Sequence, residues 1–309
     1  MWGDLRYHPI SRFYLQRFGS RVYKVSVNVA ETCPVRQGDG SRTCIFCDEW
    51  GSASFFADGH KNLGDQIDQG RARISRRFGA EKFLVYFQSY TNSFDRVEHL
   101  RQRFEVALAR EDVVGLVLGT RPDCLPKRLM ELLNEVKQRT YVMVELGAQS
   151  FFDDQLKFLR RGHDTACTLD GVRRLHEQTG VDLGLHLMFG LPGETDEHMI
   201  RTAQIINELP VHNVKLHNLH VLTNTPLAEL YASKEFEPLD LPTYAKRVIL
   251  FLRHLSPEVA VQRLAASANR WDELVAPAWT RQKMAPTQYI RDMMADQDIC
   301  QGDRGSQSV

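Results

Sequence analysis

The sequence predicts an α/β fold, either a doubly wound sheet or a complete or partial α/β barrel, and three observations lead to this prediction. Short runs rich in β-branched residues alternate about six times with longer segments of helical period, and parallel strands require such crossovers. No G-x-G-x-x-G motif opens the first helix. The first strand instead runs into a loop rich in cysteine. Because α/β folds keep their active sites at the carboxyl ends of the strands, this loop is expected at the functional edge of the sheet.

Each predicted strand is a short apolar run flanked by turn-forming residues, which is the pattern of a strand buried on both faces. The six runs cover residues 22–29, 82–87, 113–119, 140–147, 181–190 and 211–221. Apolar residues at helical spacing predict helices between them, among them 94–110, 127–139, 167–180 and 197–209. After about residue 223 the pattern changes to helical segments such as 241–255, with one short strand-like run at 258–264.

These changes of pattern divide the chain into four expected parts around one main globular body. We expect a basic and aromatic N-terminal segment at 1–21, the α/β body at 22–223, an extension at 224–295 and a disordered tail at 296–309.

Composition and charge argue against several classes of protein. The 39 basic and 39 acidic residues balance, so the global field draws the chain neither to nucleic acid nor to anionic lipid. No apolar run approaches the roughly 20 residues that cross a bilayer, and the N-terminus lacks the apolar core of a secretory signal. We therefore expect a cytoplasmic protein without a membrane partner. In that reducing compartment, clustered cysteines are metal ligands or catalysts more often than disulfides.

The N-terminal segment is locally basic although the whole chain is neutral. No acidic residue occurs from Leu5 to Ala30, where basic and aromatic side chains interleave. They are Arg6, Arg12, Arg17, Arg21, Lys24, Tyr7, Phe13, Tyr14, Phe18 and Tyr23. The segment is either a partner surface, with phosphate contacts and stacking platforms for RNA, or a solvated helix whose aromatic residues pack on the body.

Three of the six cysteines, Cys33, Cys44 and Cys47, follow the first predicted strand and are called the loop cysteines below. Two residues separate Cys44 from Cys47, a spacing that lets two thiolates reach one metal centre. Three thiolates without an obvious fourth indicate an open coordination position, as in an iron–sulfur cluster that binds substrate. A structural zinc ion with His60 or Cys124 as its fourth ligand is the alternative.

A series of longer motifs continues along the chain, and several fall at the ends of successive predicted strands. They are KVSVNVAETCP, CIFC, YFQSYTNSF, GTRPDCLP, VELGAQS, RRGHD, HLMFGLPGET, VKLHNLH, and PEVAVQRLAASA with LVAPAW. With these motifs, nearly the whole chain resembles the radical S-adenosylmethionine (SAM) enzymes, specifically their YhcC/YtqA-type branch, which is similar to the radical SAM domain of the Elongator catalytic subunit. Ten residues separate Cys33 from Cys44 instead of the superfamily's usual three, and long first gaps are typical of this branch.

The resemblance implies a TIM-barrel-like fold, namely a partial (β/α)6 radical SAM barrel with a mainly helical C-terminal extension. It also implies that the loop cysteines hold a 4Fe–4S cluster whose fourth iron binds the amino and carboxylate groups of SAM. Reductive cleavage of SAM then gives a 5′-deoxyadenosyl radical that abstracts a hydrogen atom from the substrate. A reductant such as flavodoxin or ferredoxin is therefore an expected partner.

The resemblance also implies particular SAM contacts. Phe46 matches the position that packs beside the adenine. Gln88, Ser89 and Tyr90 end the second predicted strand, where many members hold the SAM amino group. Two further matches, Gln149 and Arg161, resemble ribose and carboxylate contacts, and the planar, permanently charged guanidinium suits a carboxylate. A surface salt bridge is the alternative for Arg161.

Four more residues are expected contacts for which a plainer role is also open. Glu145 accepts hydrogen bonds from the ribose hydroxyls or closes a polar layer of the barrel. His186 stands where relatives carry an aspartate that contacts the ribose. Gly190 and Gly193 allow a close backbone approach to the adenine or form a plain tight turn.

The candidates for catalytic residues are Tyr90, Cys124 and His217. Cys124 is either a thiol near the radical or an inert packing residue. His217 and His220 are three positions apart and point to opposite faces of an ideal strand, so we expect at most one of them to reach the cavity. His217 is the expected one, in the same inward register as Lys215.

The motifs VELGAQS, RRGHD and TRPDC are Elongator-like and imply a tRNA wobble uridine or its side chain as the radical target. The zero net charge and the lack of a recognisable RNA-binding module in the sequence argue against this substrate. A small metabolite, a peptide or a cofactor precursor is therefore an alternative, because fold similarity does not fix the substrate. A non-enzymatic zinc or iron–sulfur binding protein is the competing class. Substrate, electron donor and oligomeric state are left open.

Overall fold

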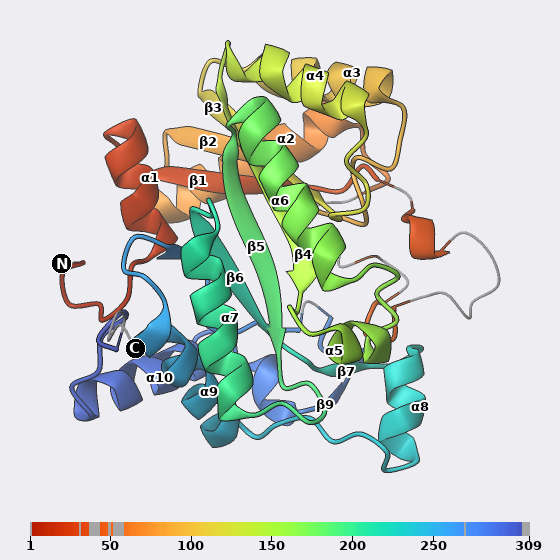
Figure 1. Ribbon diagram of the computed structural model, residues 1–309. Coiled ribbons are helices and arrows are strands. Elements are labelled where there is room, and N and C mark those ends of the chain that lie inside the picture. The colour runs from red at the N-terminus through yellow and green to blue at the C-terminus, as the bar shows by residue number, and fades with distance from the viewer. Residues whose placement is uncertain are drawn as a thin grey trace.

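The computed structural model describes residues 2–30, 32–36, 44–48, 51, 59–268 and 270–304. Its centre is a seven-stranded parallel sheet that curls into a half-barrel (Figure 1). In sheet order the strands are β1 (Val22–Val27), β2 (Lys82–Phe87), β3 (Val113–Thr120), β4 (Tyr141–Gln149), β5 (Asp182–Phe189), β6 (Asn213–Asn218) and β8 (Ala260–Val261). The order in the sheet follows the order along the chain, so β1 and β8 form its two open edges.

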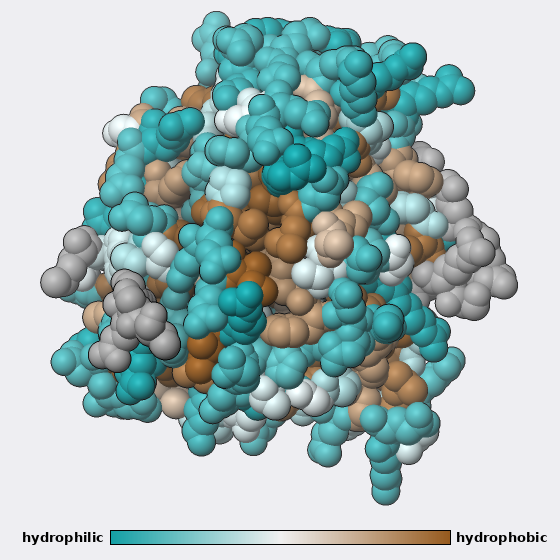
Figure 2. All heavy atoms as spheres, in the orientation of Figure 1, coloured by the Kyte–Doolittle hydropathy of each residue, from teal (hydrophilic) through white to brown (hydrophobic). Residues whose placement is uncertain are grey.

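Crossover helices cover the outer face of this sheet, and the main core lies between sheet and helices (Figure 1). They are α2 (Leu63–Phe78), α3 (Val97–Leu108), α4 (Lys127–Lys137), α6 (Thr165–Thr179), α7 (Asp196–Glu208) and α9 (Leu241–His254). Figure 2 shows the side that carries α6 and α7, where hydrophilic residues cover the helices and apolar residues appear between them. Because side chains alternate along a strand, Val85 and Phe87 join the outer core while Leu84 and Tyr86 face the inside of the barrel.

The partial barrel is confirmed, and all six predicted strands occur with ends that differ by a few residues. The helices expected at 94–110, 127–139, 167–180 and 197–209 are also present. A seventh strand, β8, comes from the strand-like run at 258–264 and pairs with β6 over two residues. A segment that the sequence places in the extension therefore forms one edge of the barrel. Among the described residues, none of the helices is long and apolar enough to span a membrane.

The rest of the C-terminal extension is mainly helical. It holds α8 (Pro226–Ala232), α10 (Ala285–Asp296) and a small antiparallel pair of β7 (Val221–Leu222) with β9 (Leu274–Ala276). Residues 297–304, expected to begin the disordered tail, pack back on the body. There the Gln301 side chain donates to the backbone oxygens of Ser256 and Val259 at 2.7 and 2.8 Å. Residues 305–309, where the rest of that expectation falls, lie outside the described residues.

Helix α1 (Ile10–Phe18) closes the amino end of the barrel. Its Tyr14 packs inside against Leu84 and Met143. Phe18 meets Tyr141, the first residue of β4, edge to face with ring centroids 5.0 Å apart. These contacts support the second interpretation of the N-terminal segment, in which the aromatic side chains pack on the body. Tyr14 is buried in the core, and Phe13 and Phe18 are partly buried against it.

Candidate active site

A cavity opens at the carboxyl ends of the barrel strands, at the edge where the sequence predicts function. Its lining comes from the loops after β1 to β4, from the ends of β5 and β6, and from Arg263, Ala266, Ser267 and Arg270 of the extension. Parallel strands bring all their carboxyl ends to one edge of the sheet, so segments distant in the sequence meet there. The site is therefore built from both the barrel and the extension.

All three loop cysteines line this cavity. Cys33 and Cys44 are buried, and burial raises the pKa of Cys47 to about 12. Two guanidinium groups approach the sulfurs: Arg161 Nη1 lies 3.5 Å from Cys44 Sγ, and Arg36 Nη2 lies 3.6 Å from Cys47 Sγ. A positive charge beside a sulfur stabilises a thiolate, so the arrangement suits an anionic metal–sulfur centre, whose ligands are deprotonated.

Neither residue proposed as a fourth zinc ligand joins the loop cysteines. His60 is exposed. Cys124 directs its thiol to Asp123 Oδ1 at 3.8 Å and is not among the described residues that line the cavity. Within the described ranges, no three His, Cys, Asp or Glu side chains gather around the position of a single metal ion.

Arg161 enters the cavity from the turn between α5 (Asp153–Phe158) and α6. It is only 8% exposed, so the surface salt bridge considered for it is wrong. Its Nη2 donates to the backbone oxygen of Gly147 at 2.9 Å, which holds the guanidinium in place. Its buried Nε has no hydrogen-bond partner in the described part of the chain. A buried donor of this kind needs an acceptor, and the carboxylate of SAM is an acceptor of the right charge.

Most of the predicted contact residues meet in this cavity. Its lining includes Phe46, Gln88, Tyr90, Glu145, Gln149, Arg161, His186 and His217. Tyr90 and Gln149 adopt left-handed backbone conformations, with φ values of 50° and 68°. Such conformations cost free energy in residues other than glycine and cluster at functional sites. The guanidinium of Arg36 lies 5.2 Å from the centre of the Tyr90 ring, which links the ends of β1 and β2.

Four predicted residues are not among the described residues that line the cavity: Ser89, Cys124, Gly190 and Gly193. Ser89 is 1% exposed. Gly190 and Gly193 lie in the turn after β5 with φ values of 91° and 68°, and the Gly190 N–H donates to the Glu194 carboxylate at 2.9 Å. The tight turn considered for the two glycines accounts for their conformation.

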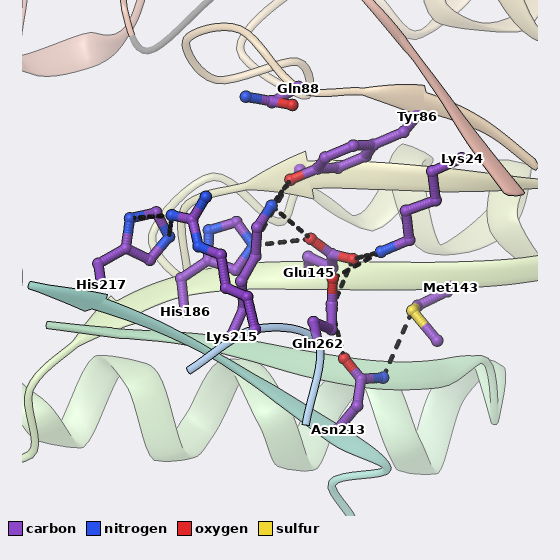
Figure 3. A network of polar contacts seen from close by, with 12 residues as sticks. Lys24, Tyr86, Gln88, Met143, Glu145, His186, Asn213, Lys215, His217 and Gln262 are labelled. Carbon is purple, nitrogen blue, oxygen red and sulfur yellow. Dashed lines mark hydrogen bonds and ion pairs between the residues drawn. The ribbon is translucent and has the colours of Figure 1, made fainter. Parts of the chain in front are cut away.

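Inside the barrel, Glu145 on β4 is the centre of a polar network (Figure 3). Its fully buried carboxylate contacts Lys24 Nζ, His186 Nε2 at 2.7 Å, Gln262 Nε2 at 2.8 Å and Lys215 Nζ at 3.7 Å. Burial alone would raise the pKa of Glu145, but the two lysine charges outweigh burial and hold this pKa well below its usual value. Glu145 therefore closes a polar layer of the barrel, and because it also lines the cavity its contact with the ribose stays a prediction.

A second part of the network is cationic. Lys215 Nζ donates to Tyr86 Oη at 3.1 Å, and burial lowers the pKa of Lys215 to about 7. Arg263 donates through Nε to the Leu216 backbone oxygen at 3.1 Å, and its Nη2 lies 2.6 Å from His217 Nδ1. Burial, helped by the Arg263 charge, lowers the pKa of His217 well below its usual value. The neutral ring can then accept from the guanidinium.

The sequence did not predict three members of this network, which are Lys24, Gln262 and Arg263. Lys24 had been counted with the basic N-terminal segment, but it points inward to Glu145 (Figure 3). The available signal was that Lys24 is a lone charged residue within an apolar strand. A polar residue at a position expected to be buried indicates a polar partner or a functional site. Gln262 and Arg263 follow β8, and no local pattern predicts that this segment lies beside β6.

His217 and His220 both line the cavity, so the expectation that at most one would do so is wrong. β6 ends at Asn218, and His220 lies in the turn before β7, where the alternation of a strand no longer applies. Lys215 and His217, which are both within β6, line the cavity together as expected.

Comparison with known proteins identifies the family. The model of the Radical SAM superfamily matches residues 27–206, and that of the Radical_SAM C-terminal domain matches residues 211–296. The chain belongs to the radical SAM superfamily. The uncharacterized protein YtqA of Bacillus subtilis (strain 168) is 33% identical over 300 residues, which cover 97% of this chain and 92% of YtqA. The resemblance to the YhcC/YtqA-type branch is therefore confirmed.

The chain is also similar to an archaeal Elp3 and to a tRNA uridine(34) acetyltransferase. The solved structure of Elp3 from the archaeon Methanocaldococcus infernus, with an N-terminal deletion, matches with a TM-score of 0.67 and 20% identity. The match covers 91% of this radical SAM chain and 64% of the Elp3 chain, and it shows a shared fold. A tRNA uridine(34) acetyltransferase of the same organism is 30% identical over 151 residues, 46% of this chain and 27% of that protein.

Members of the radical SAM superfamily are enzymes that use a 4Fe–4S cluster and SAM, and these are the cofactors of this chain. Its residues fit both groups. The sulfurs of all three loop cysteines belong to residues that line one cavity, and the buried Nε of Arg161, which has no partner among the described residues, lies on the same side chain that contacts Cys44.

Proposed function

We propose that this radical SAM enzyme holds its 4Fe–4S cluster with the loop cysteines, at the carboxyl ends of the barrel strands. The main support is that all three cysteines line one cavity in which Arg36 and Arg161 donate toward two of the sulfurs. When bound and reduced, the cluster supplies the electron that cleaves SAM into methionine and a 5′-deoxyadenosyl radical. A reductant of the flavodoxin or ferredoxin class in the cytoplasm completes the proposal.

In this proposal the chain's own residues bind and orient SAM. Arg161, held by the Gly147 backbone, donates to the SAM carboxylate through its free Nε. Gln88 and Gln149 offer amide groups from the ends of β2 and β4, and Phe46 offers an apolar face to the adenine. Such fixed contacts hold the reacting groups in place and keep water out, which contributes a large part of enzymatic rate enhancement.

The substrate is proposed to enter the same cavity from the side of β6 and of Arg263, Ala266 and Ser267. A tRNA wobble uridine is one candidate, supported by the similarity of nearly half the chain to a tRNA uridine(34) acetyltransferase. A small metabolite is the second candidate, favoured by the half-buried cations Lys215 and Arg263 on the cavity wall. In the tRNA case, Arg12, Arg17 and Arg21 are exposed near the amino end of the barrel and contribute phosphate contacts only.

Anaerobic reconstitution tests the proposed chemistry. We expect a brown protein with about four irons per chain that, after reduction, converts SAM to methionine and 5′-deoxyadenosine. The matched control omits the reductant and should leave SAM intact. A colourless chain that retains one zinc ion and does not cleave SAM would contradict the proposal.

The tRNA candidate is tested separately. Binding to tRNA should fall steeply with salt, because each phosphate contact releases counterions. Replacing Arg12, Arg17 and Arg21 together by alanine should weaken that binding. Unchanged wobble nucleosides in a strain that lacks the gene, or equal tRNA affinity of the triple variant, would count against tRNA as the substrate.

A further inference from the structure

The cavity wall near β6 carries two basic side chains, Lys215 and Arg263, on which the same carboxylate, that of Glu145, acts. Lys215 and Arg263 both line the cavity, and the carboxylates among its described lining residues are Glu145 and Asp48. Asp48 follows the last loop cysteine in the sequence. The Glu145 carboxylate is already paired with the ammonium group of Lys24, a residue that is not among the described lining residues of the cavity. One carboxylate therefore faces two lysines, and Arg263 adds a third positive charge.

Arg263 is the clearest sign of this imbalance. A guanidinium cannot be deprotonated in proteins, so it stays charged when it is buried. Its contacts go to neutral acceptors, the Leu216 backbone oxygen and the His217 ring, through Nε and Nη2. Burial lowers the pKa of the guanidinium and outweighs the charge of Glu145, which among the described residues also acts on it and raises that pKa. Arg263 is half-buried, and poorly solvated charges are normally paired, so a guanidinium bonded only to neutral acceptors on a cavity wall points to a ligand of opposite charge.

Lys215 supports the same conclusion from the neighbouring strand. Its side chain is 11% exposed, and its ammonium contacts Tyr86 Oη at 3.1 Å and the shared Glu145 carboxylate at 3.7 Å. Burial lowers the pKa of Lys215 to about 7, and an anion in the cavity would raise that pKa again. The surrounding histidines add no positive charge, because burial lowers the pKa of both His186 and His220 to about 4.

We propose that Arg263 and Lys215 form an oxyanion subsite that receives a carboxylate or phosphate group of the substrate. The inference rests on the proposed function and names the chemical class of its substrate. A guanidinium offers the forked donors that both oxyanions prefer, and the ammonium adds a point charge. Both side chains lie on the inner face of the barrel. The group they receive is therefore a terminal anion of a small molecule and not a phosphodiester within a nucleic acid backbone.

The subsite is separate from the residues proposed for the SAM carboxylate. Arg161, beside Cys44, is proposed for that group. Arg263 instead comes from the extension and contacts β6. A substrate anion and SAM are therefore expected to bind together, which gives the proposal a direct test.

The test is calorimetric titration of the reconstituted enzyme under anaerobic conditions, with and without saturating SAM. The probes are inorganic phosphate, glycerol 3-phosphate, succinate and, as the neutral control, glycerol. The variants are Arg263→Gln, Arg263→Lys and Lys215→Met. Arg173→Gln is the matched control, because Arg173 is 60% exposed on α6 and pairs with Asp170 and Glu177.

We expect at least one anionic probe to bind the wild type in the presence of SAM, and glycerol not to bind. Arg263→Gln should weaken that binding about 10- to 150-fold, the loss of a charged hydrogen bond, while Arg173→Gln should leave it unchanged. Arg263→Lys should retain more affinity than Arg263→Gln, because it keeps the charge. Unfolding curves and iron content of each variant verify that it is folded. If Arg263→Gln fails to fold, Arg263→Lys and Lys215→Met still decide the matter.

Three results would overturn the subsite. These are no anionic probe bound by the wild type, equal affinities in the wild type and the Arg263 and Lys215 variants, or displacement of the bound probe by SAM. If the wild type binds tRNA but no small anion, the subsite proposal fails and tRNA becomes the favoured substrate. The proposed chemistry is judged independently by SAM cleavage in the wild type, so a failure of one proposal is distinguishable from a failure of the other.

Discussion

Replacing Glu145 by glutamine should destabilise the fold more than any surface substitution of the same kind. The carboxylate is fully buried and lies between Lys24 and Lys215, whose side chains are 17% and 11% exposed. Glutamine keeps the shape of the side chain but removes the negative charge. Two poorly solvated ammonium groups then lose their shared partner, and the new amide N–H2 faces donors instead of acceptors.

The size of the effect follows from this burial. Removing one partner of a buried ion pair typically costs about 3 to 5 kcal/mol, because the remaining charge is left uncompensated. That is a large part of the roughly 5 to 15 kcal/mol that stabilises an ordinary domain. With a urea m-value of about 3 kcal/mol/M, Glu145→Gln should lower the midpoint by about 1 to 1.7 M. The matched control is Glu105→Gln, whose pair with Arg139 is about half exposed on both sides and contributes about 0.2 to 1 kcal/mol.

The assay is equilibrium urea unfolding of the cofactor-free full chain at pH 7, followed by circular dichroism and by tryptophan fluorescence. Coincidence of the two signals would justify a two-state treatment. If Glu145→Gln loses no more stability than Glu105→Gln, the network is not held together by charge and the interpretation of Figure 3 is wrong.

Three further predictions concern the cofactors and pH. Cys44→Ala should abolish SAM cleavage and lower the iron content, while Cys300→Ala, at an exposed thiol, should change neither; a competent cluster in the first variant would refute the ligand assignment. Arg161→Ala should keep its iron and bind SAM about 1.5 to 3 kcal/mol more weakly in calorimetry, and unchanged affinity would remove Arg161 from the site. The pKa of Lys215 is about 7 in the folded chain and about 10.4 in the unfolded chain, so the unfolded chain binds more protons between these two pH values. In this pH range Lys215 therefore makes the free energy of unfolding rise with pH. Lys215→Met should remove up to about 1.4 kcal/mol per pH unit from that rise between pH 7.5 and 9.5, and equal slopes in urea unfolding would contradict the shift.

The parts of this protein that the sequence predicts well are those governed by short-range patterns. The strands are runs of β-branched and apolar residues whose burial on both faces leaves no polar alternation, and the six predicted runs became the first six strands of the sheet. The loop cysteines were also predictable, because their spacing and their place after the first strand are both local. Arg161 came only from the resemblance, and the structure places it beside Cys44.

The parts that could not be predicted depend on tertiary placement. Arg263 lies in the extension, and it reaches the cavity because β8 pairs with β6; the strand-like run at 258–264 predicts a strand there but does not predict its partner. His220 enters the cavity because β6 ends two residues before it, and strand ends are set by long-range pairing. The sequence pattern around Tyr14 and Phe18 also fits a basic helix with exposed aromatic side chains. Only the tertiary structure shows that this helix covers the amino end of the barrel.

The charges of the cavity also constrain how a substrate can be held for radical chemistry. Hydrogen abstraction requires the target C–H bond to be fixed close to the radical, because misplacement by about 1 Å can cost a large factor in rate. Arg161 lies beside the Cys44 sulfur, while Arg263 comes from the extension and contacts β6, so the two cations proposed to bind anions come from different elements around one cavity. Gln88 and the low-pKa His186 in the same lining carry no charge at neutral pH, whereas Arg36, Arg121, Arg270 and Asp48 also line the cavity. A substrate anchored by an anion at Arg263 would thus present its uncharged part to SAM, which is where a C–H bond has to lie.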